Sequence, residues 1–156
     1  MLIENFITFF ARKENSRYLQ FSSSAPLSLL PNKENAPLLL YLHVPFCEEL
    51  CPYCSFHRIV FQESIAKEYF SALRREINLY KDLGYDFRAV YVGGGTPTVL
   101  IDELASTLER VKKIYSVAEI SVETNPNHLT PNNLKLLKDI GVNRLSVGVQ
   151  SFDDGL

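Results

Sequence analysis

Three cysteines close together are the first residues of this sequence whose types and spacing indicate chemistry. Cys47, Cys51 and Cys54 have the spacing Cys-x3-Cys-x2-Cys, and the chain contains no other cysteine. Three thiolates on one short loop can bind three irons of a cubane 4Fe-4S cluster and leave the fourth iron open for a ligand. His57 follows three residues after Cys54, so a zinc site with three cysteines and one histidine is the alternative prediction. An odd, tight group of cysteines cannot form a disulfide framework, which favours a metal site in a reducing compartment.

Polar or glycine-rich segments follow the other predicted strands. Residues 93–98, Gly-Gly-Gly-Thr-Pro-Thr, are neither a P-loop nor a dinucleotide-binding fingerprint. Consecutive glycines let a ligand approach the backbone closely, and we expect their N–H groups to be free for a carboxylate or amine-bearing ligand. Glu123 ends a later strand, where a carboxylate suits ribose hydroxyls or an ammonium group. Taken singly, the glycine run is also compatible with a tight turn, Glu123 with a solvated loop residue, and Gln150 with a polar cap on a strand end.

Alternating hydrophobic patterns predict the elements that position these residues. Short apolar runs predict four strands, at residues 38–44, 87–92, 119–122 and 144–149. Helical spacing between them predicts helices over residues 65–80 and 102–115, and a third that begins with Thr130 as N-cap and runs to Gly141. Such βα repeats imply an α/β fold with parallel strands and outer helices, either an open sheet or a barrel. Because the carboxyl ends of parallel strands meet at one rim, we expect the cysteines, the glycine turn, Glu123 and Gln150 to lie together there.

Length and composition limit the architecture. The 156 residues are 46% hydrophobic and 22% charged with a net charge of −2, which is typical of a globular domain and gives no basic excess for binding nucleic acid. We find no signal peptide and no apolar run long enough to span a membrane, so we expect a cytoplasmic protein. Proline-rich residues 22–37 predict that residues 1–37 are an N-terminal appendage and linker. Residues 38–156 then form the N-terminal part of a partial (βα) TIM-like barrel of about four strands, apparently truncated.

The cysteine segment resembles a known family. Residues 41–54, Tyr-Leu-His-Val-Pro-Phe-Cys-Glu-Glu-Leu-Cys-Pro-Tyr-Cys, resemble the radical S-adenosylmethionine (SAM) superfamily. They are similar in particular to the branch of oxygen-independent coproporphyrinogen III oxidase and the related heme chaperone, and the resemblance covers residues 38–154. It implies that SAM chelates the open iron of a 4Fe-4S cluster. One electron from the cluster then cleaves SAM reductively to methionine and a 5'-deoxyadenosyl radical, while the protein supplies binding and orientation.

The resemblance also implies roles for particular residues. Tyr41 would contact SAM near the cluster, and Tyr53 would lie beside the adenine. The methionyl amino end of SAM would bind at the glycine turn, through Gly94, Gly95 and Thr96. Glu123 would hold SAM, and Gln150 matches a position associated with a second SAM. His43 and His128 receive no role, and we expect both to be structural.

The leading functional prediction from the resemblance is a radical SAM enzyme that acts on a tetrapyrrole, as in the oxidative decarboxylation of coproporphyrinogen III. It implies an electron donor such as flavodoxin or ferredoxin. Oxidases of this group commonly carry a fourth cysteine two residues after the triad, where this chain has Phe56. The alternatives are therefore a heme chaperone that keeps the cluster, a heme-degrading radical SAM methyltransferase, and a zinc-stabilised interaction module. We expect these 156 residues by themselves to be inactive, because half a barrel leaves rim residues missing.

Overall fold

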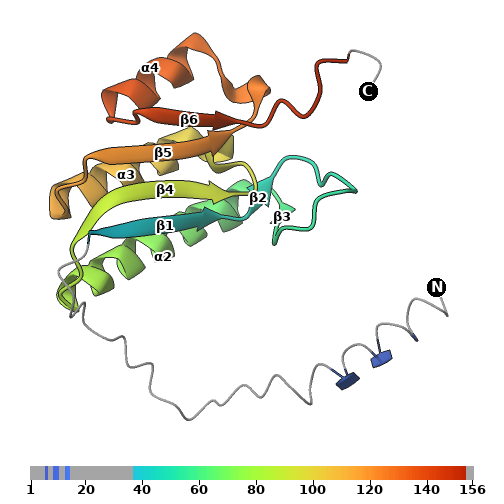
Figure 1. Ribbon diagram of the computed structural model, residues 1–156, viewed down its shortest axis with the longest axis horizontal. Helices are drawn as coiled ribbons and strands as arrows, with labels where there is room; N and C mark the ends of the chain where they lie inside the picture. Colours follow the sequence, from blue (N-terminus) through green and yellow to red (C-terminus); the bar gives the residue numbers. More distant parts are fainter. Residues whose placement is uncertain (1–5, 7–8, 11–12, 15–36, 154–156) are drawn as a thin grey trace. The chain divides into compact units, whose positions relative to one another are not determined.

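A computed structural model describes residues 6, 9–10, 13–14 and 37–153 (Figure 1). The chain divides into two compact units, Met1–Leu30 and Pro31–Leu156. The described residues of the first unit are helical, and the rings of Phe6 and Phe10 lie 4.8 Å apart. Most of the segment expected to be an appendage and linker, residues 1–37, lies outside the described residues.

The second unit is built on one parallel sheet. Its four strands lie in the order β1-β4-β5-β6, and every neighbouring pair is parallel. The strands are β1 (Leu38–Val44), β4 (Phe87–Gly94), β5 (Glu119–Thr124) and β6 (Arg144–Val147). The α/β fold with parallel strands is therefore confirmed.

Helices connect the successive strands. They are α2 (Glu63–Asp82), α3 (Ile101–Ile114) and α4 (Pro131–Asp139). Figure 1 shows α2 and α3 behind the sheet, on the same side of it, as right-handed crossovers between strands in sequential order require. The largest side chains of the core that are almost fully buried come from these helices, from the sheet face they cover and from the short strand β2 (Phe46–Cys47): Phe46, Phe70, Ile77, Leu104, Leu108, Leu137, Val44, Val90, Val92, Val111 and Val122. Within the described residues of the second unit, no helix covers the opposite face of the sheet (Figure 1).

Local sequence signals explain where the helices begin and end. Helix α2 buries Ala66, Phe70, Leu73 and Ile77, which follow helical spacing. It ends just before Gly84, whose φ of +84° is left-handed and favours glycine. The predicted N-cap of α4 is confirmed, because the Thr130 side chain accepts a hydrogen bond from the N–H of Asn133.

Some strand boundaries differ from the prediction. β4 and β5 each run two residues further, because Gly93 and Gly94 still pair with β1 and Thr124 still pairs with β6. β6 ends at Val147 rather than at residue 149, and beyond it the N–H of Gly148 donates to the Thr124 carbonyl at 3.0 Å. A further parallel pair, which the hydrophobic pattern did not predict, joins β2 (Phe46–Cys47) and β3 (Ile59–Val60).

Two short 3-10 helices, η1 (Pro97–Leu100) and η2 (Pro126–His128), follow β4 and β5 directly. Both begin with proline, whose fixed φ suits the first helical position. They place polar side chains at the carboxyl end of the sheet. Among the described residues, no helix combines the length and the apolar character that a membrane span needs.

Candidate functional site

The three cysteines lie in one loop, residues 47–58, which we call the cysteine loop. Its two ends are joined by β2 and β3: the N–H of Ile59 donates to the Pro45 carbonyl at 2.8 Å, and that of Phe61 donates to the Cys47 carbonyl at 2.8 Å. Within the loop the N–H of Cys54 donates to the Cys51 carbonyl at 3.2 Å. All three thiols are free. The short strand pair therefore closes the loop and leaves its cysteines available as ligands.

Two groups act on the Cys47 thiol from outside the cysteines. Burial raises the pKa of this thiol, while a hydrogen bond from the Thr96 hydroxyl, 3.8 Å from Sγ, and the positive charge of Arg58 lower it. Arg58 also donates from Nη2 to the Cys51 carbonyl, and its buried Nε has no partner among the described residues. Hydrogen bonds to a sulfur and nearby charge are two of the factors that tune iron–sulfur sites. Arg58 was not singled out by the sequence analysis, because nothing in the sequence shows that it folds back over the loop.

The backbone N–H groups of the glycine turn (residues 93–98) donate hydrogen bonds within the protein itself. The N–H of Gly94 donates to Glu123 Oε2 at 3.1 Å. The N–H of Gly95 donates to the last carbonyl of β1 at 2.8 Å, and that of Thr96 to the first carbonyl of β2 at 2.7 Å. The expectation that these N–H groups would be free for a ligand was therefore wrong. The cause is that the turn lies where the sheet meets the cysteine loop and is hydrogen-bonded to β1 and β2. We call this junction the seam.

The same seam explains why glycine is required. Gly94 has a φ of +123°, and a Cβ added there would lie 2.7 Å from the Val44 carbonyl oxygen. A Cβ on Gly95 would lie 2.6 Å from the Phe46 carbonyl oxygen and 2.8 Å from Cys47 Sγ. Contacts this short cannot be accommodated without moving backbone. The glycines therefore permit the close approach of the turn to Cys47.

Glu123 is held by two donors. The Tyr91 hydroxyl donates to Oε1 at 2.6 Å, and the N–H of Gly94 donates to Oε2. Accepting this bond, Glu123 raises the pKa of the Tyr91 hydroxyl. The carboxylate is half-buried and lies within β5, so it is not a solvated loop residue. It is pre-oriented at the strand end, with lone pairs left for further donors.

One cavity of about 960 Å³ lies at this rim. Ligand sites for small molecules typically measure about 300–1,000 Å³. All of the residues predicted for the site except Tyr41 line it: Cys47, Cys51, Cys54, Tyr53, Gly94, Gly95, Thr96, Glu123 and Gln150. The structure therefore brings together side chains from four separate segments, as the strand-end argument predicted.

Of the remaining predicted residues, Tyr53 and Gln150 line the cavity, whereas Tyr41 does not. Tyr53 is 70% exposed, and its hydrogen bond to Cys51 raises the pKa of the phenol. Gln150 lies beyond β6 with a φ of +67°. Tyr41 is half exposed on the uncovered face of the sheet, where it stacks on Tyr91 with 6.0 Å between ring centroids. Its hydroxyl lies 3.1 Å from His43 Nδ1, and Tyr41 does not line the cavity.

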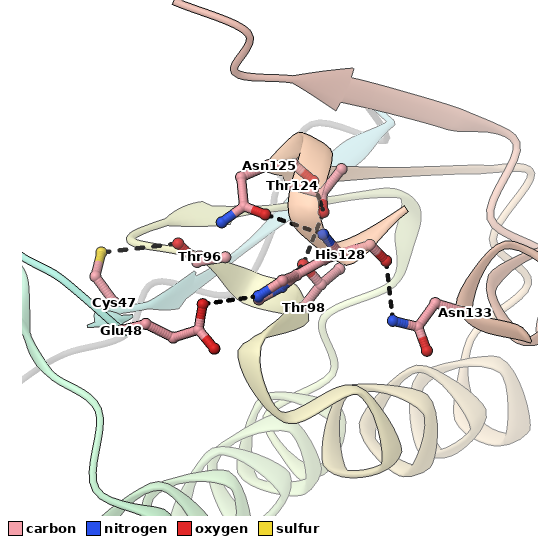
Figure 2. Close-up of polar contacts among 8 residues, drawn as sticks. All are labelled: Cys47, Glu48, Thr96, Thr98, Thr124, Asn125, His128 and Asn133. Atoms are coloured by element: carbon pink, nitrogen blue, oxygen red, sulfur yellow. Dashed lines mark hydrogen bonds and ion pairs between the residues drawn. The ribbon is translucent and has the colours of Figure 1, made fainter. Parts of the chain in front are cut away.

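His128 is a rim residue that the sequence analysis left without a role. Its imidazole lies between Thr98 of η1 and Glu48 of the cysteine loop, as Figure 2 shows. Its position directly after the third strand is the signal that could have placed it at the rim. No sequence pattern links it to Glu48, which lies 80 positions away in the chain.

The donor set of the cysteine loop fits a multi-iron cluster. Within the described residues no three His, Cys, Asp or Glu side chains converge on one metal position. The ring of His57 lies beside that of His43, at 6.1 Å between centroids. Three free thiols line a cavity with room for a larger group. Three thiolates are the ligand set of a cubane cluster with one open iron.

Comparison with known proteins gives consistent matches. The family model for the Radical SAM superfamily matches residues 41–156. Heme chaperone HemW of Bacillus subtilis is 45% identical over 123 residues, which cover 74% of this chain and 32% of that protein. Oxygen-independent coproporphyrinogen III oxidase of Bradyrhizobium diazoefficiens is 41% identical over 135 residues, covering 81% of this chain and 30% of that protein.

A solved structure agrees with the sequence matches. The coproporphyrinogen III oxidase HemN from Escherichia coli, described as a radical SAM enzyme, superposes with a TM-score of 0.68 at 33% identity. The match covers 76% of this chain and 29% of HemN, and it is consistent with a partial barrel. The chain thus spans about a third of the length of the relatives it matches.

Proposed function

The chain belongs to the Radical SAM superfamily, and on that premise we propose that Cys47, Cys51 and Cys54 bind a 4Fe-4S cluster and that the adjoining cavity binds SAM. The observation that carries this proposal is that the three cysteines line the same cavity, of about 960 Å³, as the glycine turn, Glu123 and Gln150. When bound, the cluster and SAM supply reductive cleavage of the sulfonium carbon–sulfur bond. The protein supplies ligands, orientation and charge.

The cysteine loop and the glycine turn would act as one unit in this site. The turn donates two backbone N–H groups to the segment that carries Cys47, and the Thr96 hydroxyl approaches the Cys47 sulfur. Arg58 places a positive charge beside the thiolates, which stabilises the negative charge of the ligand set. In metal sites generally, contacts from neighbouring residues of this kind hold the ligands in position.

Glu123 would orient SAM. Tyr91 and the Gly94 N–H fix both of its oxygens, so the carboxylate does not have to reorganise when a hydroxyl or ammonium group of the ligand approaches. Gly94, Gly95 and Thr96 would support the methionyl end by their shape, since their N–H groups are bonded within the protein. Tyr53 and Gln150, both on the cavity wall, remain candidates for the adenine and for a second SAM.

For the overall reaction we propose an oxidoreductase of the coproporphyrinogen III oxidase type, acting in tetrapyrrole metabolism. This rests on the names of the relatives, including a solved oxidase structure at 33% identity. The free cysteines suit a reducing compartment, so we place this chemistry in the cytoplasm with flavodoxin or ferredoxin as the class of electron donor.

A heme chaperone that keeps the cluster is the second candidate. Two observations favour it: the match to Heme chaperone HemW at 45% identity, and Phe56, 73% exposed on the cavity wall, where oxidases of this group commonly have a fourth cysteine. An exposed aromatic ring beside the cysteine loop could contact a planar tetrapyrrole by stacking.

The first experiment tests the cofactor assignment. After anaerobic reconstitution we expect about four irons and four sulfides per chain, the content of a cubane cluster. After reduction, the electron paramagnetic resonance spectrum should change when SAM is added, because SAM binds at the open iron. One zinc without sulfide would overturn the proposal. The Cys51→Ala chain, prepared in parallel, is the matched control and should take up no cluster.

The second experiment separates the two candidate functions. Because the 156 residues by themselves are expected to be inactive, turnover is tested in a full-length chain in which they replace the matching segment of a relative. The oxidase proposal predicts that this chain, reconstituted and supplied with SAM and a reductant, consumes coproporphyrinogen III. The chaperone proposal predicts stable heme binding, followed by absorbance, without that consumption. Phe56→Cys tests whether this position helps to separate the two functions. If it does, the variant should consume more coproporphyrinogen III and bind heme less stably.

A further inference from the structure

His128 is fixed on four sides at the carboxyl end of the sheet (Figure 2). Its side chain is only 12% exposed. Its backbone N–H donates to Asn125 Oδ1 at 3.1 Å, and its carbonyl accepts from Asn133 Nδ2 at 2.9 Å. Its Nδ1 lies 2.8 Å from the hydroxyl oxygen of Thr98, a buried residue of η1. Backbone and ring are thus both held, and the imidazole has one orientation.

The fourth contact of His128 reaches the cysteine loop. Its Nε2 lies 3.2 Å from Glu48 Oε2. Because an ionised carboxylate only accepts, Nε2 carries the hydrogen, and in the neutral imidazole Nδ1 then accepts from the Thr98 hydroxyl. The Thr98 oxygen lies 2.7 Å from the hydroxyl of Thr124, which can donate to it. The chain of hydrogen bonds from β5 to Glu48 is therefore complete.

The segment that holds His128 also contacts the first cysteine. Thr96 and Thr98 flank Pro97, and the Thr96 hydroxyl approaches Cys47 Sγ at 3.8 Å. Glu48 follows Cys47 directly. The first two residues of the cysteine loop are consequently held from one segment, Cys47 directly and Glu48 through His128.

We propose that His128 is a positioning residue that latches Glu48 and so fixes the start of the cysteine loop in the conformation that presents its thiols. The side chain of Glu48 is 59% exposed, so packing does little to restrain it. Cys51 is exposed on irregular backbone, and three thiolates must converge to bind a cluster. A restraint on the loop in the metal-free protein reduces the entropy lost on metal binding. The consequence for the cluster rests on the proposed function, whereas the latch itself does not.

The test uses Glu48→Ala, His128→Ala and the double variant, with Glu49→Ala as the matched control. Glu49 is the adjacent glutamate of the same loop and has no partner among the described residues.

Two rates are measured: anaerobic alkylation of the thiols in the metal-free chain, and loss of iron to a chelator after reconstitution. We expect each single variant to raise both rates about two- to fivefold, the range for a partly exposed ion pair. The double variant should be no faster than the faster single one, because both remove the same interaction. Glu49→Ala should match the unsubstituted chain.

Several results would overturn the latch. One is a Glu48→Ala chain with unchanged alkylation, and another is additive rates in the double variant. An effect of His128→Ala without an effect of Glu48→Ala would assign His128 to packing alone. If His128→Ala does not fold, the exposed Glu48 variant decides the question, and His128→Gln, which keeps a donor toward Glu48, should restore slow alkylation. If the unsubstituted chain binds no iron, the proposed function fails while the alkylation rates still test the latch.

Discussion

The two faces of the sheet differ although the same strands build both. On the helix side, Leu42, Val44, Val92 and Val122 are each at most 2% exposed. On the other side, aromatic and polar residues of neighbouring strands lie next to one another, as in the pairing of Tyr41 with Tyr91 and of Tyr91 with Ser121. Successive side chains of a strand point to opposite faces, so each strand contributes to both environments.

The contrast separates the sources of stability and of function. The helix side buries apolar side chains, which is the main favourable term in folding. The uncovered side leads to Glu123 and to the cavity at the carboxyl ends of the strands, where α/β sheets generally bind ligands. Substitutions on one side should therefore change stability with little effect on ligands, and those at the rim should do the reverse.

Removing a cysteine should give the largest effect at the rim. Cys47→Ala, Cys51→Ala or Cys54→Ala should each abolish cluster assembly, because no spare cysteine can replace the lost thiolate. Iron and sulfide analysis with the absorbance of the reconstituted protein measures this. For the exposed Cys51 the urea midpoint of the metal-free chain should stay unchanged. Full iron content in any one variant would refute its assignment as a ligand.

A pair of leucines on one strand tests the helix side. Leu42 is 2% exposed and Leu39 is 57% exposed, on opposite faces of β1. Leu42→Ala should lower the free energy of unfolding by about 2–5 kcal/mol, through lost burial and a cavity. Leu39→Ala should change it by less than about 0.5 kcal/mol. Denaturant unfolding of the metal-free chains measures both. Equal losses would mean that the uncovered face contributes to the core as much as the helix side.

A pair of glycines tests the seam between sheet and cysteine loop. Gly84 and Gly94 both have positive φ, but a Cβ would meet nothing within 4 Å at Gly84 and would meet the Val44 carbonyl at 2.7 Å at Gly94. Gly84→Ala should cost about 1–2 kcal/mol of stability from backbone strain alone. Gly94→Ala should cost about 1–3 kcal/mol more from overpacking and should also reduce iron uptake. A Gly94 variant that behaves like the Gly84 control would show that the seam adjusts freely.

The four strands of the main sheet and the helices between them could be predicted because each depends on a local pattern, whereas the short pair of β2 with β3 could not. The run at residues 38–44 and the Thr130-Pro131 cap show their structure within a few residues of sequence. The common rim followed from topology, since parallel strands must end together. The spacing of the three cysteines by itself indicated a metal site.

The contacts within the site could not be predicted, because they join segments far apart in the chain. The N–H of Gly95 is bonded to β1, and His128 contacts a glutamate 80 positions earlier. Nor does spacing show that Arg58 folds back onto its own loop. Hydrogen bonds of this kind depend on backbone geometry that forms only in the folded protein.

Two tyrosines provide the smallest and sharpest test of the contrast between faces. The Tyr91 hydroxyl donates to Glu123 at the rim, whereas that of Tyr115 donates to the Ile77 carbonyl at 3.2 Å within the core. Each hydrogen bond should contribute about 0.5–1.5 kcal/mol. Tyr115→Phe should therefore lower the free energy of unfolding by that amount and leave SAM affinity unchanged. Tyr91→Phe should weaken SAM binding about two- to tenfold, because the carboxylate of Glu123 loses one of its two fixed donors, and should lower the free energy of unfolding by no more than Tyr115→Phe does. Equilibrium dialysis with SAM and urea unfolding of the same two variants measure both effects. If both variants lost stability alone, the rim would be an extension of the core, and Glu123 would have no role in orienting the ligand.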